Sequence, residues 1–346
     1  MQDNTAWRVG VYWDELAARP DQLRRVAEAT GAEPVICQEG TAPPDVEVLV
    51  GGDLPDTVPR ETPHLRLVQL SSAGANQLEN HPLWRGDVPI ATASGVHGVQ
   101  IPEHVLMLLL ALRRHLPRYI AAQRAHVWRH DAVEDDGASI APGELYGLTL
   151  GLVGYGHIGR GVAHLARAFG LRVLATSHSA TEERPLDIPG VRPFEDPPAV
   201  PAPSLEPDLT LPLARLDDLL AASDAVVICA PLTPETEGLF DEARLGRMKP
   251  GALLVNIARG KIVVEDALAR ALTTGRLGGA GLDVTAEEPL APDSSLWDLP
   301  NVIVTPHISG HSDRYVERAV NILLANIDRL RRGEPPVTAV DRDRGY

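Results

Sequence analysis

Short apolar runs alternate with segments of helical periodicity along most of the chain. In the first part, strands are predicted at 9–13, 46–50, 67–70 and 88–91, and a helix at 21–30. Further strands are predicted at 148–153, 171–175, 224–230, 253–257, 280–284 and 302–305, and helices at 162–169, 213–222 and 265–274. Strands that alternate with helices predict parallel sheets. The fold class is therefore α/β, and the second region predicts a doubly wound sheet.

Three segments stand apart from this alternation. Apolar residues from 100 to about 128 recur at helical spacing, which predicts one long helix with a kink at Pro117, buried between units or between subunits. Segment 181–212 is crowded with proline and acidic residues. Because such a composition cannot form a sheet core, we expect an extended or partly disordered surface insertion there. A closing helix is predicted at 312–330, where it can pack back on the first unit.

A glycine turn joins the strand at 148–153 to the helix that follows. Gly154, Gly156 and Gly159 have the spacing G-x-G-x-x-G. Gly154 would make the tight turn, Gly156 would let the backbone approach a pyrophosphate, and Gly159 would let the helix pack on the strand. The helix N-terminus would offer free N–H groups to the phosphates. This spacing alone is often only a tight turn, but a strand before it and a helix after it favour a dinucleotide site.

Several polar residues stand at or just after predicted strand ends, where ligands bind in open α/β sheets. Arg259 offers a planar fork for a carboxylate, and His307 can exchange a proton near neutral pH. A carboxylate such as Glu288 beside the histidine would hold one tautomer and raise its pKa. With a nicotinamide at the glycine turn, these groups predict an oxidoreductase for 2-hydroxy or 2-keto acids. Each residue alone has an ordinary alternative, as a surface ion pair, a turn residue or a helix cap.

Composition and charge limit the kinds of binding partner and the cellular compartment that we expect. The net charge of −15 argues against nucleic acid or an anionic membrane as a partner. Two cysteines give neither a metal-ligand spacing nor a disulfide framework. The N-terminus lacks the apolar region of a signal peptide, and no apolar stretch is long enough to span a bilayer. We expect a cytoplasmic protein without a metal site.

A series of motifs runs from about residue 95 to residue 310. They are Gly154-Tyr-Gly-His-Ile-Gly159, Pro231-Leu-Thr-Pro-Glu-Thr236, Met248-Lys-Pro-Gly251, Val255-Asn-Ile-Ala-Arg-Gly260, Gly281-Leu-Asp-Val284 with Glu288-Pro289, and Asn301-Val-Ile-Val-Thr-Pro-His307. In kind and order they resemble the D-isomer-specific 2-hydroxyacid dehydrogenase family. The first ninety residues resemble that family mainly through Ser72-Ala-Gly74.

The resemblance implies two Rossmann-like, doubly wound domains. Residues 1–98 and 309–346 would form a discontinuous, flavodoxin-like substrate-binding domain. Residues 99–308 would form the NAD(P)-binding domain, with 181–212 as a proline-rich insertion. The family also implies a cleft that closes on binding and a homodimer built largely through the cofactor domain. The long helix after Gln100 would supply the crossover and part of that interface.

The resemblance also implies roles for individual residues. His307 would be the general acid/base, Glu288 its partner, and Arg259 the residue that binds the substrate carboxylate and carbonyl. The expected substrate-binding residues are Ser72, Ala73, Gly74, Arg259 and His307. Asp283 would contact the nicotinamide carboxamide. The residues expected at the cofactor are Gly154, Tyr155, Gly156, His157, Ile158, Gly159, Ser177, His178, Ser179, Ala230, Pro231, Thr236, Ile257, Ala258, Arg259, Asp283, His307 and Gly310.

The end of the second strand departs from the pattern of NAD-binding folds. An acidic residue about 20 positions beyond the glycine turn usually binds the ribose hydroxyls of NAD. Ser177 stands there instead, followed by His178 and Ser179. Without a carboxylate to repel it, a 2′-phosphate could accept hydrogen bonds from these side chains, which favours NADP over NAD. The usual arginine is missing unless Arg184 supplies it, so NAD or dual use stays open.

We expect an NAD(P)-dependent reductase of small 2-keto acids, of the glyoxylate or hydroxypyruvate type. A phosphoglycerate or phosphite dehydrogenase of the same family is one alternative. A nucleotide-sensing, corepressor-like binding protein on the same fold is another, because fold does not fix function. The chain ends soon after the predicted closing helix, so we expect no appended regulatory domain of the kind common among phosphoglycerate dehydrogenases.

Overall fold

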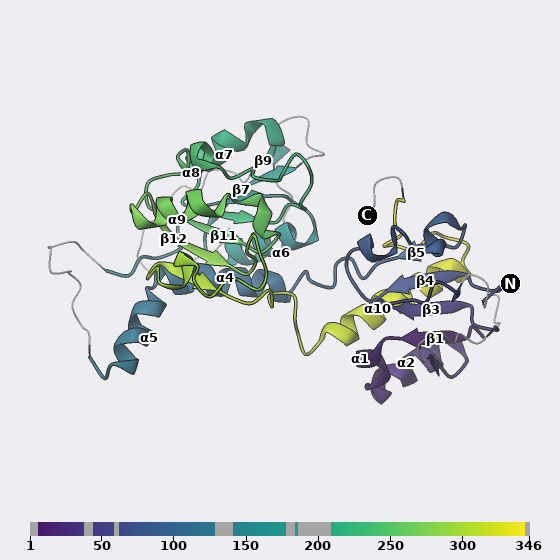
Figure 1. Ribbon diagram of the computed structural model, residues 1–346. Coiled ribbons are helices and arrows are strands. Elements are labelled where there is room, and N and C mark those ends of the chain that lie inside the picture. The colour runs from purple at the N-terminus through teal and green to yellow at the C-terminus, as the bar shows by residue number, and fades with distance from the viewer. Residues whose placement is uncertain are drawn as a thin grey trace. The chain divides into compact units, whose positions relative to one another are not determined.

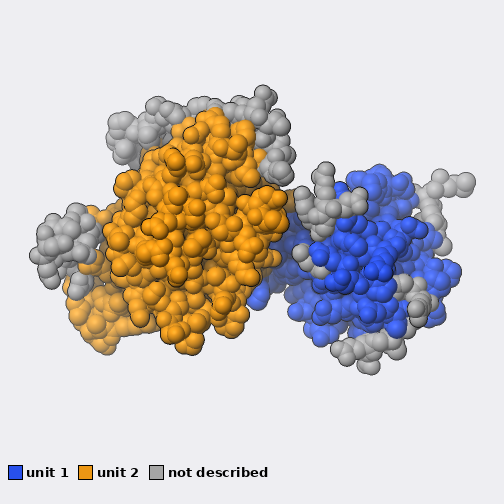
Figure 2. Space-filling model, turned by 45° about the horizontal axis from the view of Figure 1, so that its top comes forward, with its two compact units in different colours: residues 1–97, 311–346 blue, residues 98–310 orange. Residues whose placement is uncertain are grey.

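The computed structural model describes residues 6–37, 44–58, 62–128, 141–177, 184–185 and 209–342 (Figure 1). The chain divides into two compact units, one of residues 1–97 with 311–346 and one of residues 98–310 (Figure 2). Each unit has its own sheet and its own buried core. Among the described residues, no helix combines the length and the apolar character needed to cross a membrane.

The first unit, which is formed by both ends of the chain, contains a five-stranded parallel sheet in the order β2-β1-β3-β4-β5. Its strands are β1 (Val9–Tyr12), β2 (Val35–Ile36), β3 (Val48–Gly51), β4 (Leu67–Leu70) and β5 (Ile90–Ala91). Its helices are α1 (Asp14–Ala17), α2 (Pro20–Thr30) and α10 (Tyr315–Arg331). This strand order is that of flavodoxin-like sheets.

Helix α10 returns the C-terminal end of the chain to this first unit, as the sequence predicts. Its apolar face is buried in the same core as Trp7, Val9 and Val11. Within the helix, the buried side chain of Asn326 fixes the segment that follows α10. Its Nδ2 donates to Gln69 Oε1 at 2.8 Å, and its Oδ1 accepts from the amide of Val337 at 2.8 Å. A buried polar side chain needs such partners, so this network joins the C-terminal segment firmly to β4.

The second unit contains an eight-stranded sheet in the order β13-β12-β11-β10-β6-β7-β9-β8. Its strands are β6 (Thr149–Val153), β7 (Arg172–Ser177), β8 (Arg184–Pro185), β9 (Leu209–Pro212), β10 (Ala225–Ile228), β11 (Ala252–Asn256), β12 (Leu277–Leu282) and β13 (Val302–Val304). All pairs are parallel except β8 with β9. The order reverses between β6 and β10, which is where a doubly wound sheet binds its ligand.

Helices cover both faces of this sheet (Figure 1). Helices α4 (Gln100–Arg113) and α6 (His157–Ala168) enclose one core, and α7 (Leu216–Ala222), α8 (Glu242–Leu245) and α9 (Glu265–Thr273) enclose the other. Alternate residues of the central strands enter the two cores, for example Val226 on one face and Val227 on the other. This is why these strands appear in the sequence as unbroken apolar runs.

The expectation of one continuous helix from residue 100 to about 128 is wrong. The helix ends at Arg113, and His115 takes a positive φ of 55° before α5 (Leu116–Arg124) begins. Pro117 stands in the first turn of α5, a position where proline starts a helix without loss of a hydrogen bond. Helix α4 is largely buried, whereas α5 buries none of its residues and projects away from the sheet (Figure 1).

The expectation that segment 181–212 contributes nothing to a sheet core is also wrong at its end. Residues Leu209–Pro212 form β9, which pairs with β7, and Thr210 and Leu211 are buried. The last four residues lack the acidic side chains of the preceding part, and proline is tolerated at the strand end. Most of the segment, residues 186–208, lies outside the described residues.

Candidate functional site

The glycine turn lies at the reversal point of the second sheet. Gly154 follows β6 with φ of 100°, and a Cβ there would lie 2.9 Å from the backbone nitrogen of Ala230. A Cβ on Gly159 would lie 2.5 Å from the carbonyl oxygen of Gly154. A Cβ on Gly156 would meet nothing within 4 Å. Two glycines are thus required by close packing, while Gly156 faces open space at the N-terminus of α6, where a pyrophosphate would fit.

The loop after β10 is held by its own side chains. Thr236 Oγ1 donates to the carbonyl oxygen of Pro231 at 2.7 Å and accepts from the amide of Thr233 at 2.7 Å. Thr236 is buried, so its hydroxyl closes this loop. The loop runs past Ala230, whose backbone packs against Gly154. The main chain of this loop, more than the threonine side chain, is available to line a cofactor.

The turn after β11 presents Arg259. Asn256 shapes this turn, because its Nδ2 donates to the Arg259 carbonyl oxygen at 3.0 Å and its Oδ1 accepts from the Ala258 amide at 3.1 Å. A Cβ on Gly260 would lie 1.9 Å from the backbone of Thr285. Only glycine fits there, so the turn of Arg259 packs directly on the segment that leads to Glu288. The side chain of Arg259 itself is exposed.

Glu288 and His307 form a direct contact. Nδ1 of His307 lies 2.7 Å from Glu288 Oε2, and Glu288 Oε1 accepts from the amide of Thr285 at 3.2 Å. An ionised carboxylate only accepts hydrogen bonds, so Nδ1 of the imidazole carries the hydrogen. Both side chains remain partly exposed. The opposite ring nitrogen, Nε2, is then the one that can exchange a proton with a bound molecule.

Asp283, which follows β12, is buried and fully hydrogen-bonded. Its Oδ1 accepts from Thr305 Oγ1 at 2.6 Å and from the Ile308 amide at 3.0 Å, and its Oδ2 accepts from the Ser309 amide at 3.0 Å. Burial raises the pKa of the carboxyl, but the hydrogen bonds from Ser309, Thr305 and Ile308 outweigh it, so the pKa lies below its ordinary value. The side chain holds the loop that carries His307.

Tyr155 lies within the glycine turn, and His157 and Ile158 are the first residues of α6. Ile257, Ala258 and Gly310 lie on the same loops as Arg259 and His307, and the carbonyl oxygen of Gly310 accepts from Gln100. Ser177 ends β7, beside the glycine turn, because the amide of Gly154 donates to the neighbouring Thr176 carbonyl. His178 and Ser179 lie outside the described residues.

Ser72, Ala73 and Gly74 belong to the other unit, where they follow β4. Ser72 Oγ donates to the Gly74 carbonyl oxygen at 2.8 Å and accepts from Gln77 Nε2 at 2.6 Å. Tyr315 at the start of α10 donates from its hydroxyl to the Ser71 carbonyl oxygen at 2.6 Å. These contacts fix the loop, and the backbone of Ala73 and Gly74 stands at the carboxyl edge of its own sheet.

Sequence reasoning missed the roles of four polar residues of this region. Asn256 was included in a motif, but its role in shaping the Arg259 turn had no signal in the sequence. Gln100 and His104 stand on α4, whose strong apolar pattern predicts only a core helix. Thr305 follows β13 and looked like an ordinary strand end. The contacts of Gln100 and His104 span 210 and 201 positions, so local patterns do not reveal these two residues.

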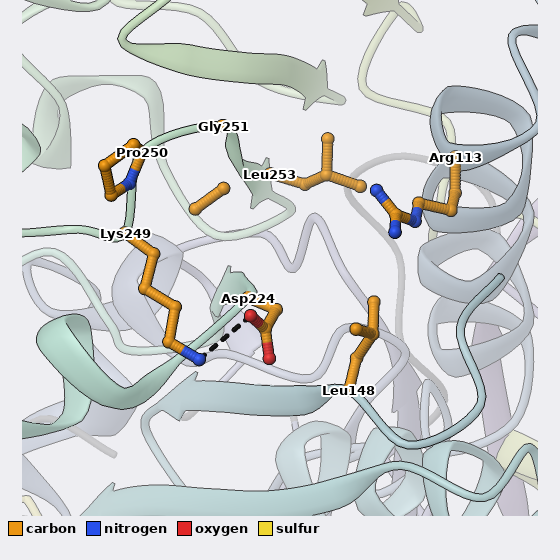
Figure 3. Close-up of a pocket in the computed structure, with 8 residues that line it drawn as sticks. Arg113, Leu148, Asp224, Lys249, Pro250, Gly251 and Leu253 are labelled. Carbon is orange, nitrogen blue, oxygen red and sulfur yellow. Dashed lines mark hydrogen bonds and ion pairs between the residues drawn. The ribbon is translucent and has the colours of Figure 1, made fainter. Parts of the chain in front are cut away.

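A cavity of about 140 Å³ lies at the amino ends of the strands of this sheet, opposite the ends that carry the glycine turn (Figure 3). It is lined by Arg113, Leu148, Asp224, Lys249, Pro250, Gly251, Ala252 and Leu253. Lys249 Nζ lies 2.9 Å from Asp224 Oδ1, and Asp224 Oδ2 accepts from the Thr149 amide at 2.9 Å. These contacts tie together the amino ends of β6, β10 and β11. Sites for sizeable ligands start at about 300 Å³, so the cavity does not suit a dinucleotide.

Comparisons with known proteins identify the family of this chain. The family model described as D-isomer specific 2-hydroxyacid dehydrogenase, NAD binding domain, matches residues 106–309. D-3-phosphoglycerate dehydrogenase of Mycobacterium leprae is 34% identical over 334 residues, which cover 94% of this chain and 54% of that protein. Glyoxylate reductase of Pyrococcus furiosus is 32% identical over 281 residues, which cover 81% of this chain and 77% of that protein.

A solved structure of NADPH-dependent glyoxylate/hydroxypyruvate reductase from Sinorhizobium meliloti, with NADP and sulfate, superposes with a TM-score of 0.72. Its identity is 26%, over 99% of this chain and all of that one. The chain thus spans about half the length of the mycobacterial relative and most of the length of the reductases. From its matched NAD binding domain and its full-length relatives, the chain belongs to the D-isomer specific 2-hydroxyacid dehydrogenase family of oxidoreductases.

Proposed function

We propose that this protein is an NAD(P)-dependent reductase that interconverts a small 2-keto acid and the corresponding D-2-hydroxy acid. The observation that carries the proposal is the 2.7 Å contact between His307 Nδ1 and Glu288 Oε2, next to the turn of Arg259. All three residues follow the carboxyl ends of strands in the unit that contains the glycine turn. This reaction needs a group that exchanges a proton, a group that binds the substrate carboxylate, and a turn that binds the nucleotide.

The open space at Gly156 and the N-terminus of α6 suit the pyrophosphate of a dinucleotide. When bound, a reduced nicotinamide supplies hydride to the substrate carbon. Arg259 binds the substrate carboxylate and polarises the carbonyl, and His307 Nε2 gives its proton to the carbonyl oxygen. Glu288 stabilises the imidazolium before transfer and keeps the Nδ1–H tautomer afterwards.

NADP is the proposed cofactor, with NAD as the alternative. Ser177 ends β7 in place of the carboxylate that usually binds the NAD ribose. The relative from Sinorhizobium meliloti is named as NADPH-dependent and its structure contains NADP. His178 and Ser179 would add donors to a 2′-phosphate. A carboxylate at this position would repel the 2′-phosphate of NADP. The presence of serine there therefore supports NADP as the cofactor.

Glyoxylate and hydroxypyruvate are the proposed substrates, because the relatives that this chain matches over most of their length carry these names. 3-Phosphoglycerate is the alternative, supported by the mycobacterial relative. A corepressor-like binding protein on this fold is the second class of function, and it would bind nucleotide without turnover.

We further propose a cytoplasmic homodimer. Helix α5 supports the dimer, since Leu116, Tyr119 and Ile120 on it are exposed apolar residues.

Initial rates with the purified protein test this proposal. Glyoxylate, hydroxypyruvate and 3-phosphohydroxypyruvate are each supplied with NADPH and with NADH. We expect rapid oxidation of NADPH with glyoxylate or hydroxypyruvate. Oxidation of NADH alone would keep the reaction class and contradict the NADP assignment. Nucleotide binding without turnover of any 2-keto acid would contradict the enzymatic proposal and favour the binding protein.

A further inference from the structure

Two polar side chains of α4 reach the segment that carries His307. Gln100 Nε2 donates to the Gly310 carbonyl oxygen at 3.0 Å, and His104 Nε2 lies 3.0 Å from Thr305 Oγ1. The two side chains are four residues apart, so they stand on the same face of the helix. Helix α4 is anchored in the core through Val105, Leu108 and Leu109. A rigid helix therefore contacts both ends of segment 305–310.

The directions of these hydrogen bonds follow from their partners. Thr305 Oγ1 gives its hydrogen to Asp283 Oδ1 at 2.6 Å, so it accepts from His104 Nε2. His104 is then an Nε2–H donor. Burial lowers its pKa, against the raising effect of Asp283, whose Oδ1 lies 3.8 Å away. The imidazole is therefore neutral at neutral pH, and a chain of two hydrogen bonds runs from α4 to the buried Asp283 carboxylate.

These hydrogen bonds lead to the backbone around His307, which has a strained conformation. His307 has φ of 52°, a conformation that residues with a Cβ rarely adopt. Its amide donates to the Asp283 carbonyl oxygen at 2.8 Å, and the next two amides donate to the Asp283 carboxylate. The orientation of Asp283 therefore sets the backbone from which the His307 side chain extends. Strained conformations of this kind persist only where surrounding contacts impose them.

We propose that His104 is a positioning residue of the active site, which acts through Thr305 and Asp283 to hold His307 in place, with Gln100 fixing the far end of the segment. The catalytic part of this proposal rests on the proposed function, in which His307 is the acid/base group. His104 touches no reacting atom. Its role is to keep the His307 loop in one conformation before the substrate arrives.

Three variants and one matched control test this inference. His104→Leu removes the first hydrogen bond of this series and Thr305→Val removes both, each with little change in volume, and His104→Gln keeps an N–H donor near the position of Nε2. His164→Leu makes the same substitution as the first variant at an exposed position of α6. The first measurement is hydrogen exchange of the backbone amides at 307–309 in the protein without nucleotide. It needs no turnover, so it is independent of the proposed function.

Exchange at 307–309 should be about fivefold faster in His104→Leu, the factor that one net hydrogen bond provides, and faster still in Thr305→Val, which loses two. It should stay near the wild-type rate in His104→Gln and His164→Leu. Unchanged exchange in both His104→Leu and Thr305→Val would overturn the inference. If His104→Leu does not fold, Thr305→Val and His104→Gln still give the comparison.

The second measurement is steady-state kinetics with the preferred 2-keto acid. We expect kcat to fall by about tenfold to hundredfold in His104→Leu and Thr305→Val, with KM for the nucleotide unchanged, because misplacement of a catalytic group slows chemistry. His104→Gln should recover most of kcat. Faster exchange without loss of kcat would overturn the positioning role, provided that His307→Ala abolishes turnover. Full turnover in His307→Ala would instead contradict the proposed function.

Discussion

The amide of His307 donates to the carbonyl oxygen of Asp283 at 2.8 Å, although His307 has the unfavourable φ of 52°. The Asp283 carboxylate holds the same loop through three more hydrogen bonds, from Thr305, Ile308 and Ser309. One buried residue thus fixes the backbone of the proposed acid/base group. The consequences for stability and for catalysis can be measured separately.

Asp283→Asn should destabilise the protein by about 2–3 kcal/mol at pH 7, because charge-assisted hydrogen bonds are lost. The folded-state pKa of Asp283 lies below its unfolded value. Its stabilising contribution is therefore fully present above the unfolded pKa of about 3.9 and is lost as the pH falls through the folded pKa. Urea unfolding from pH 7 to pH 3 measures this difference, which should shrink only at the acid end.

The exposed residue Asp293 gives the matched control. Asp293→Asn should change the free energy of unfolding by less than about 0.5 kcal/mol at any pH in this range. An equal effect of the two substitutions, or a difference for Asp283→Asn that shrinks well above pH 5, would contradict the role of the Asp283 carboxylate as the hydrogen-bonded centre of the loop.

Gly156→Ala separates cofactor binding from folding. A Cβ at Gly156 meets nothing within 4 Å, so the melting temperature should stay within a few degrees of wild type. The same Cβ would occupy the space proposed for the pyrophosphate, so the Kd for NADPH should rise by at least about tenfold. Calorimetric titration with NADPH measures this change. Unchanged affinity would remove Gly156 from the cofactor site.

Gly159→Ala provides the contrast on the same turn. Its Cβ would lie 2.5 Å from the carbonyl oxygen of Gly154, so this variant should lose stability as well as nucleotide affinity.

Ser177→Asp should move cofactor preference from NADPH to NADH. A carboxylate at the end of β7 would accept from the ribose hydroxyls of NADH and repel the 2′-phosphate of NADPH. We expect the ratio of kcat/KM for the two cofactors to change by about tenfold or more, which corresponds to about 1.4 kcal/mol. The same ratio in wild type and variant would show that this position does not contact the ribose.

Arg331→Ala should weaken the unit of the two chain ends. The guanidinium lies 5.4 Å from the ring centroid of Trp7 and donates to the Ala29 carbonyl at 2.7 Å and the Thr30 carbonyl at 3.1 Å. It thus caps α2 and stacks on a buried ring, and its loss should cost about 2 kcal/mol. Denaturant unfolding followed by tryptophan fluorescence measures this.

The side chain of the neighbouring Arg332 forms exposed ion pairs with Asp328 and Glu334. Arg332→Ala should therefore change the free energy of unfolding by less than about 0.5 kcal/mol. Equal losses in the two variants would mean that the contact with Trp7 and the carbonyl caps contribute nothing specific.

The sequence predicts the elements that depend on local chemistry. Buried parallel strands appear as apolar runs, and the glycine turn is recognisable because Gly154 and Gly159 are each required by a close backbone approach. The closing helix α10 is also predicted, and its apolar residues enter the core of the first unit. The pairing of Glu288 with His307 was proposed from family resemblance, and the structure brings these two side chains together.

Other features depend on contacts between distant positions and were missed. The break at His115 follows from a positive φ that no pattern indicates. Strand β9 is only four residues long and follows a proline-rich, acidic stretch, so its pairing with β7 decides its structure. His104 looked like one polar residue in an apolar helix, and its role depends on Thr305, 201 positions away.

The most direct test of the central claim is the turnover of His307→Ala with hydroxypyruvate and NADPH, measured together with the Kd for NADPH. A positioned acid/base group contributes about 10²–10⁴-fold. We predict that kcat falls by that factor while the Kd for NADPH stays within about threefold of wild type. Near-normal kcat in this variant would contradict the assignment of His307 as the group that transfers the proton.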